Sequence, residues 1–317
     1  MSTRTVRFGV NLMPQLWVEG PVLSGPALMT HRARLLTRMA EVGIDHVMVG
    51  DHVMFHGGVG NDGLTDAASV VTATDDLGVY LAVYLMVLRH PLLVARQILT
   101  VAQFAPGRLS LGLGIGGDDR NEVLACGVDP RTRGRRMDES LGLVRRLLAG
   151  ETVDHEGEFF SLAGARIHPA PEQPVPLVVG GRSDAALRRA GRLGDGWLGI
   201  WTSAKRCAEA ITAVERHGAE AGRTDVAWAH GMTFWCGFGV DRAEARNRVA
   251  PAMEGLYRTP FENFERYIPY GTPDEVAEFV APFIEAGCTT LNFIPFAGSD
   301  DAGINAVAET RTLLGAG

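Results

Sequence analysis

Residues 107–117 read GRLSLGLGIGG, an apolar run that ends in alternate glycines. A run of this kind is typical of a strand that is buried on both faces, as in a parallel sheet. Similar short β-rich runs recur along the chain, and longer segments with a helical period separate most of them. The candidate strands cover residues 6–11, 46–50, 80–85, 109–115, 177–179, 196–200, 228–238 and 290–294.

This alternation predicts the fold class. Strands that alternate with helices form parallel sheets joined by right-handed crossovers. Eight such units favour a closed barrel over an open doubly wound sheet, and a chain of 317 residues suits one barrel. We therefore expect an α/β protein with a single (β/α)₈ TIM-barrel domain over residues 1–317.

The helical segments and the insertions follow from periodicity and turn signals. In residues 133–149, Met137, Leu141, Val144 and Leu148 recur at i, i+4, i+7 and i+11, which predicts one apolar stripe on a helix. Residues 153–160 predict a small hairpin, and the aromatic-rich residues 256–271 predict a lid. We expect both segments to interrupt the barrel repeat.

Composition excludes several classes of protein. The net charge of −7 implies no broad attraction to nucleic acid or to anionic membranes. The N-terminal residues contain no apolar signal core and the most apolar stretch is short, so we expect a cytoplasmic protein that does not span a membrane. The four cysteines form no CxxC motif, which indicates reduced thiols and neither a zinc site nor a redox pair.

The first candidate for chemistry is the pair Asp51-His52, which follows the second predicted strand. Active sites of barrels lie at the carboxyl ends of the strands, and an imidazole there can exchange a proton near neutral pH. Asp51 would hold its tautomer. The alternative is a capped loop with a histidine at the surface. A metal site formed by Asp51, His52 and His56 is disfavoured, because a loop does not align an i,i+4 pair of ligands.

Two glycine-rich segments are candidates for cofactor binding. Gly112, Gly114 and Gly116 would let a flat ring lie against the backbone, although tight packing explains them equally well. The second segment joins a strand to a helix N-terminus, a combination that binds phosphate through backbone N–H groups. A simple turn capped by Ser183 or Asp184 is the other interpretation. The predicted phosphate-binding residues are Val179, Gly180, Gly181 and Arg182.

Taken together, these segments resemble the luciferase-like monooxygenase superfamily, and most closely its branch that uses coenzyme F420. The resemblance runs from the first predicted strand to the last. It rests on the order and spacing of residues 43–45, 50–52, 88–95, 105–114, 133–139, 179–183, 194–197 and 271–275.

The resemblance implies a place for each part of the cofactor. The deazaflavin ring would lie at the barrel mouth against a strand bulge near Ala82 and Val83, where relatives have a non-proline cis peptide. Asp51 would bind the polar edge of the ring, and His52 would act as acid or base beside the reactive carbon. The ring would also lie near Gly114 and Gly116.

The resemblance also implies an activity. We expect an F420-dependent oxidoreductase that transfers a hydride between deazaflavin and a small organic substrate. The alternative is an FMN-dependent monooxygenase in which His52 stabilises a peroxide adduct, but flavin-using relatives tend to have Glu-His-His where this chain has Gly50-Asp51-His52. A cofactor-binding protein without catalysis and a metal-dependent hydrolase are further alternatives. Relatives are commonly homodimers.

Two positions depart from the relatives that oxidise sugar phosphates. Those relatives have a glutamate just after the glycines of the fourth strand, where this chain has Gly117 followed by Asp118-Asp119. They also have a tryptophan shortly after the Asp-His pair, where this chain has Phe55-His56. We therefore expect a substrate other than a sugar phosphate.

Overall fold

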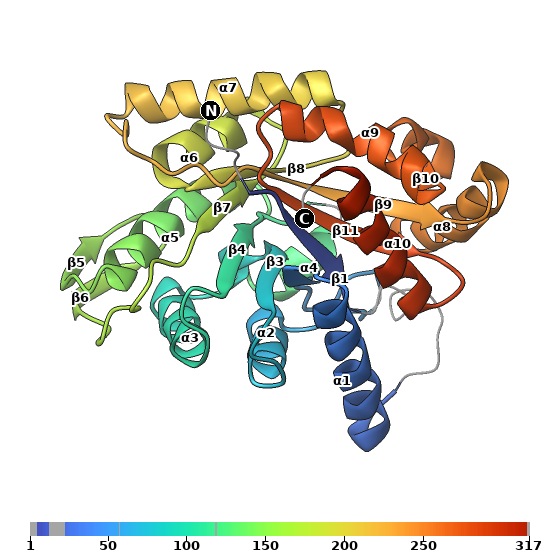
Figure 1. The fold of residues 1–317 in the computed structure, drawn as a ribbon. Coiled ribbons are helices and arrows are strands. Elements are labelled where there is room, and N and C mark those ends of the chain that lie inside the picture. Colours follow the sequence, from blue (N-terminus) through green and yellow to red (C-terminus); the bar gives the residue numbers. More distant parts are fainter. Residues whose placement is uncertain (1–4, 13–22, 57, 118, 316–317) are drawn as a thin grey trace. The chain divides into compact units, whose positions relative to one another are not determined.

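The computed structural model describes residues 5–12, 23–56, 58–117 and 119–315 (Figure 1). The strands are β1 (Arg7–Asn11), β2 (His46–Val49), β3 (Gly78–Tyr84), β4 (Leu109–Leu113), β5 (Val153–Glu156), β6 (Ser161–Ala165), β7 (Leu177–Gly180), β8 (Gly196–Ile200), β9 (Gly231–Phe238), β10 (Tyr270–Gly271) and β11 (Thr290–Phe296). The α-helices are α1 (Gly25–Glu41), α2 (Gly63–Val71), α3 (Pro91–Phe104), α4 (Arg120–Ala125), α5 (Arg133–Leu148), α6 (Asp184–Leu193), α7 (Ala204–Glu220), α8 (Arg242–Tyr257), α9 (Pro273–Glu285) and α10 (Asp300–Leu313). The described residues also form the 3₁₀ helices η2 (Met86–Leu88), η3 (Phe261–Asn263) and η4 (Glu265–Tyr267).

The large sheet confirms the predicted fold class. Its strand order is β10-β9-β11-β1-β2-β3-β4-β7-β8, and β8 also pairs with β9. Within the described part of the chain, eight parallel strands thus close into a (β/α)₈ barrel, and β10 extends it at β9. Each predicted strand overlaps one of these eight.

The chain divides into two compact units. The first contains residues 1–48, 198–213 and 229–317, and the second contains residues 49–197 and 214–228. The single domain over residues 1–317 stays a prediction. In the first unit, β1 pairs in parallel with both β2 and β11, and β11 pairs with β9.

A buried histidine shapes one face of the sheet in the first unit. The His46 side chain lies over Gly9, where an added Cβ would be 2.0 Å from the ring Nε2, so position 9 has no room for a side chain. His46 Nε2 also lies 2.7 Å from Asn292 Oδ1. Burial, together with the charge of Arg7, lowers the pKa of His46 to about 3 even though the Asn292 contact opposes this shift.

The second unit contains β3, β4 and β7, which pair in parallel. The register of β3 against β4 shifts between Leu81 and Tyr84, and the Ala82–Val83 peptide is cis. The bulge and the cis peptide therefore lie where the family resemblance predicted them.

The predicted hairpin is also present in the second unit. Strands β5 and β6 pair antiparallel, and the hairpin lies beside α5 (Figure 1). The Glu139 carboxylate of α5 binds the hairpin. It accepts hydrogen bonds from the N–H groups of Phe159 and Phe160, and it lies 2.9 Å from His155 Nε2. The predicted lid over residues 256–271 contains the end of α8, the two short helices η3 and η4, and β10.

Local signals place several helix starts correctly. Thr272 caps α9 in a capping box with Glu275, and Pro273 is the first helical residue. All four cysteines are free thiols, but Cys207 Sγ and Cys288 Sγ lie 3.5 Å apart, a proximity that their sequence separation had concealed. No helix among the described residues combines the length and apolarity needed to cross a membrane.

The buried His46 predicts acid sensitivity of the fold. A free histidine takes up a proton near pH 6.5, whereas His46 in the folded chain does so only near pH 3. Its contribution to stability is therefore intact above pH 6.5 and is lost by about 1.4 kcal/mol per pH unit as the pH falls toward 3. The variant His46→Gln should lack this loss. Urea unfolding of both proteins between pH 7 and 4 measures it, and parallel stability curves would contradict the assignment.

Candidate active site

The loop after β2, whose described residues are 50–56 and 58–61, is anchored through the Asp51 carboxylate. This side chain is fully buried. Its Oδ1 accepts the Gly63 N–H at 2.9 Å and Arg89 Nη2–H at 2.9 Å, and its Oδ2 accepts the Leu85 N–H at 2.8 Å and Arg89 Nη1–H at 2.8 Å. Each oxygen accepts two hydrogen bonds, which fills the usual acceptor capacity of a carboxylate.

These four contacts give Asp51 a structural role, and its predicted contact with the polar edge of a ring stays a prediction. A carboxylate that is fully enclosed and fully hydrogen-bonded has no oxygen left for the polar edge of a ring. The geometry favours a positioning role, in which Asp51 fixes the loop that presents His52. Arg89 also reaches Asp62 at 2.9 Å, and the two acids raise its pKa although burial opposes this.

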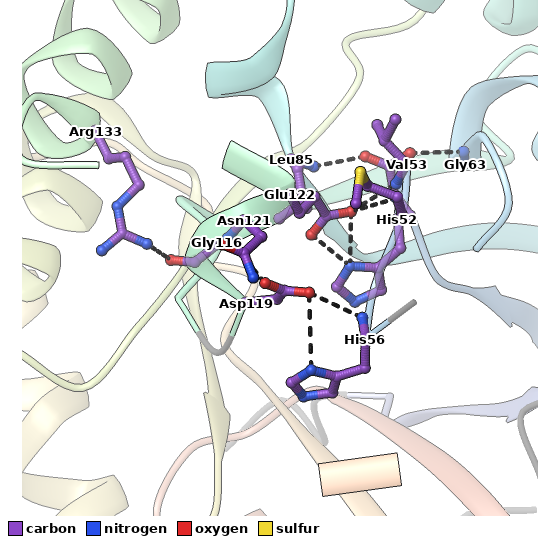
Figure 2. Close-up of polar contacts among 12 residues, drawn as sticks. His52, Val53, His56, Gly63, Leu85, Gly116, Asp119, Asn121, Glu122 and Arg133 are labelled. Carbon is purple, nitrogen blue, oxygen red and sulfur yellow. Dashed lines mark hydrogen bonds and ion pairs between the residues drawn. The ribbon is translucent and has the colours of Figure 1, made fainter. Parts of the chain in front are cut away.

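His52 is held by a carboxylate that the sequence analysis did not identify. Figure 2 shows His52 Nδ1 facing Glu122, at 3.0 Å from Oε2. Glu122 Oε1 accepts the N–H groups of Val53 at 2.6 Å and Met54 at 3.2 Å. With Nδ1–H donating to the carboxylate, Nε2 is the nitrogen of the neutral ring that can take up a proton.

Glu122 is an ionised partner for this histidine. Its side chain is 2% exposed, and that burial works against ionisation. The hydrogen bond and charge of His52, with the backbone N–H groups of Met54 and Val53, outweigh burial and lower the pKa of Glu122. A buried anion beside Nδ1 orients the imidazole.

His56 lies beside a second acid, Asp119, which directly precedes α4. Its N–H donates to Asp119 Oδ2 at 2.9 Å, and its ring Nδ1 lies 3.7 Å from the same oxygen. Asp119 also caps α4 by accepting the Asn121 N–H. The described residues include no cluster of three or more His, Cys, Asp or Glu side chains that could hold a metal ion. Asp118 lies outside the described residues.

The bulge of β3 is a partly exposed segment of an otherwise buried strand. Ala82 and Val83 are half-buried, whereas the other residues of β3 are buried. Gly114 has a packing role here, because an added Cβ would lie 2.4 Å from Val83 Cγ2. Gly116 is half-buried with φ +65°, and its carbonyl accepts Arg133 Nη1–H at 2.7 Å (Figure 2). Val83 and Gly114 therefore lie in contact, and the ring site predicted at these residues stays a prediction.

The turn between β7 and α6 has features of both earlier interpretations. Ser183 caps α6 by accepting the Ala186 N–H, as the simple-turn interpretation predicted. Gly181 has φ +128°, a conformation that favours glycine, and Arg182 is exposed beside the helix N-terminus. Asp184 places a negative charge in the same first turn. A phosphate would therefore depend on backbone N–H groups and Arg182 to offset that charge.

Residues 6–269 match the family model described as luciferase-like monooxygenase. An F420-dependent glucose-6-phosphate dehydrogenase of Kineococcus radiotolerans is 32% identical over 286 residues, which cover 80% of this chain and 83% of that protein. An uncharacterized protein of Mycobacterium tuberculosis is 38% identical over 154 residues, 49% of this chain. That alignment covers 52% of the mycobacterial protein, so the chain spans about half the length of this relative.

Solved structures agree at the level of the fold. An F420-dependent secondary alcohol dehydrogenase in complex with an F420-acetone adduct superposes with a TM-score of 0.81 over 98% of this chain and 99% of that chain. The two sequences are 20% identical, so this likeness concerns the fold alone. The family model, in contrast, matches the sequence itself from β1 to the residues just before β10. The chain therefore belongs to the luciferase-like monooxygenase family.

Proposed function

We propose that this chain is an F420-dependent oxidoreductase that transfers a hydride between deazaflavin and a small organic substrate. The proposal rests chiefly on His52, whose Nδ1 is held at 3.0 Å from the buried Glu122 carboxylate in the loop after a barrel strand. A relative that shares 32% identity over most of its length is named for F420. The match to some other relatives covers only about half of their length.

The described residues fit the parts of this cofactor. The half-buried bulge at Ala82 and Val83 offers an apolar surface for one face of a flat ring. Gly180 and Gly181, which precede α6, and the guanidinium of Arg182 offer the donors that a phosphate requires. When bound, F420 supplies or accepts the hydride.

The chain itself handles the proton. His52 would take the hydroxyl proton of an alcohol, or give one to the oxygen of a ketone, through Nε2. Glu122 would stabilise the resulting imidazolium, and Asp51 would keep the loop in place through its four hydrogen bonds. We propose an unphosphorylated alcohol or ketone as substrate, because Phe55-His56 replaces the tryptophan expected in sugar-phosphate relatives.

FMN is the alternative cofactor, since its ring and phosphate would use the same residues. Asp51 does not decide between the two, because its buried carboxylate is already saturated. The predicted homodimer and the cytoplasmic location stay predictions.

Cofactor binding tests the first part of the proposal. Titration monitored by fluorescence should give a micromolar or lower Kd for F420 and weaker binding of FMN. Arg182→Gln should weaken F420 binding by about tenfold or more, because a charged hydrogen bond to phosphate is lost. Arg216→Gln is the matched control, since Arg216 pairs with Glu220 on α7. Tight binding of FMN with no binding of F420 would refute the cofactor assignment.

Turnover tests the role of His52. The variant His52→Gln keeps a hydrogen-bonding group beside Glu122 but cannot exchange a proton in the neutral range. Its kcat with F420 and a secondary alcohol should fall by about 10²–10⁴-fold, while F420 affinity stays within a few-fold. The control is His217→Gln, which alters a histidine paired with Glu220 at 2.9 Å. If His52→Gln turns over as fast as the control, His52 is not the acid or base.

A further inference from the structure

Cys207 and Cys288 are neighbouring thiols in the first compact unit. Their Sγ atoms lie 3.5 Å apart, although the residues are 81 positions apart in the chain. Cys207 lies in the first turn of α7, and Cys288 lies between α9 and β11. Both residues belong to the first unit, so the contact lies within one compact part of the fold. No motif in the sequence relates the two thiols, and only the packing of α7 against this turn brings them together.

The turn before Cys288 maintains this contact. Gly287 follows the C-cap of α9 with φ +111°, a conformation that favours glycine. A Cβ built at Gly287 would lie 3.7 Å from Ile211 Cδ1, and Ile211 is one helical turn after Cys207. The turn therefore packs against the face of α7 that contains Cys207, and the two sulfurs stay neighbours as long as this packing is kept.

The pair lies just below the surface of the protein. Cys207 and Cys288 are 0% and 1% exposed. The residues next to them in the chain are exposed or half-buried; these are Arg206, Ala208, Gly287 and Thr289. Local opening of one turn would therefore admit a small molecule such as a hydroperoxide without unfolding of the sheet.

The distance between the sulfurs suits the formation of a bond. A disulfide bond is about 2.05 Å long, so sulfurs that lie 3.5 Å apart need to approach by roughly 1.5 Å. Rotations about the two Cα–Cβ bonds supply a movement of this size. The contact with Cys207, followed by burial, holds the pKa of Cys288 well above its usual range. Cys288 therefore keeps its proton at neutral pH, and Cys207 supplies the attacking thiolate.

We propose that Cys207 and Cys288 are a modification site, which a hydroperoxide converts from two thiols to a disulfide. In the first step the Cys207 sulfur attacks a peroxide oxygen, the O–O bond breaks, and the rest of the peroxide leaves as an alcohol or as water. The product is a sulfenic acid, whose sulfur has given two electrons to the peroxide. In the second step the Cys288 sulfur attacks this sulfur, the S–O bond breaks, and the hydroxyl leaves as water with the Cys288 proton.

The neighbouring thiol gives this oxidation a defined end point. A sulfenic acid that meets more peroxide becomes a sulfinic acid, which thiols do not reduce. With Cys288 in contact, the disulfide forms first, because the second step takes place within the folded chain. A thiol in solution then restores the pair by exchange. The disulfide would also join α7 covalently to the segment that precedes β11.

Treatment of the folded chain with excess hydrogen peroxide tests the proposal. Free thiols are then blocked with iodoacetamide, and the protein is digested with trypsin in the absence of reductant. Mass spectrometry should find residues 207–216 linked to residues 267–311, and dithiothreitol should release the link. Alkylation of Cys207 and Cys288 at the level of untreated protein would overturn the proposal, and so would a sulfinic acid at either position without the link.

Variants and thermal unfolding complete the test. Cys207→Ala and Cys288→Ala should each abolish the link, whereas Cys236→Ala, which removes an equally buried thiol outside the pair, should keep it. On oxidation the Tm of wild type should rise by about 5 °C, because the bond joins residues 81 positions apart. A Tm that is unchanged or lower in the linked protein would show that the fold opposes the bond, and would overturn the proposal. The wild-type result decides even if a variant does not fold, and it is independent of F420 binding.

Discussion

The second unit is organised around one buried charge, the carboxylate of Asp51. An ionised carboxylate removed from water costs several kcal/mol unless it is fully hydrogen-bonded. Asp51 meets this constraint with donors from the start of α2, the residue after β3 and the guanidinium of Arg89. Because each donor must remain in place, this constraint ties three successive segments to the loop after β2. The loop that presents His52 therefore has a defined course.

The same principle operates at the start of α4, where two acids contact the loop. Glu122 and Asp119 both accept hydrogen bonds from backbone N–H groups of the loop. These bonds give the N–H groups an acceptor and give the buried carboxylates a donor. Their position also brings each carboxylate next to an imidazole. A substitution of either acid would therefore change both the support of the loop and the surroundings of an imidazole.

The sequence alone determined the barrel, the hairpin and several helix starts. These features depend on interactions between residues that are close along the chain. The apolar stripe of α5, the capping box of Thr272 and Glu275, and the short buried strands are all local patterns. The Asp51-His52 pair was also identified from its position after a strand, because the carboxyl ends of barrel strands converge. The bulge at Ala82–Val83 followed from the family resemblance and not from a local pattern.

Only the tertiary structure decided which groups the site residues contact. Glu122 is 70 residues from His52 in the chain, and no periodic or capping signal relates the two. The saturation of Asp51 was equally hidden, because its donors come from Gly63, Leu85 and Arg89, up to 38 residues away. Ion pairs and hydrogen bonds act over a few ångströms in space, so their partners are fixed only when the loops of different βα units meet. Local sequence patterns predict the helices and strands, whereas the packing of these elements determines which side chains form hydrogen bonds and ion pairs.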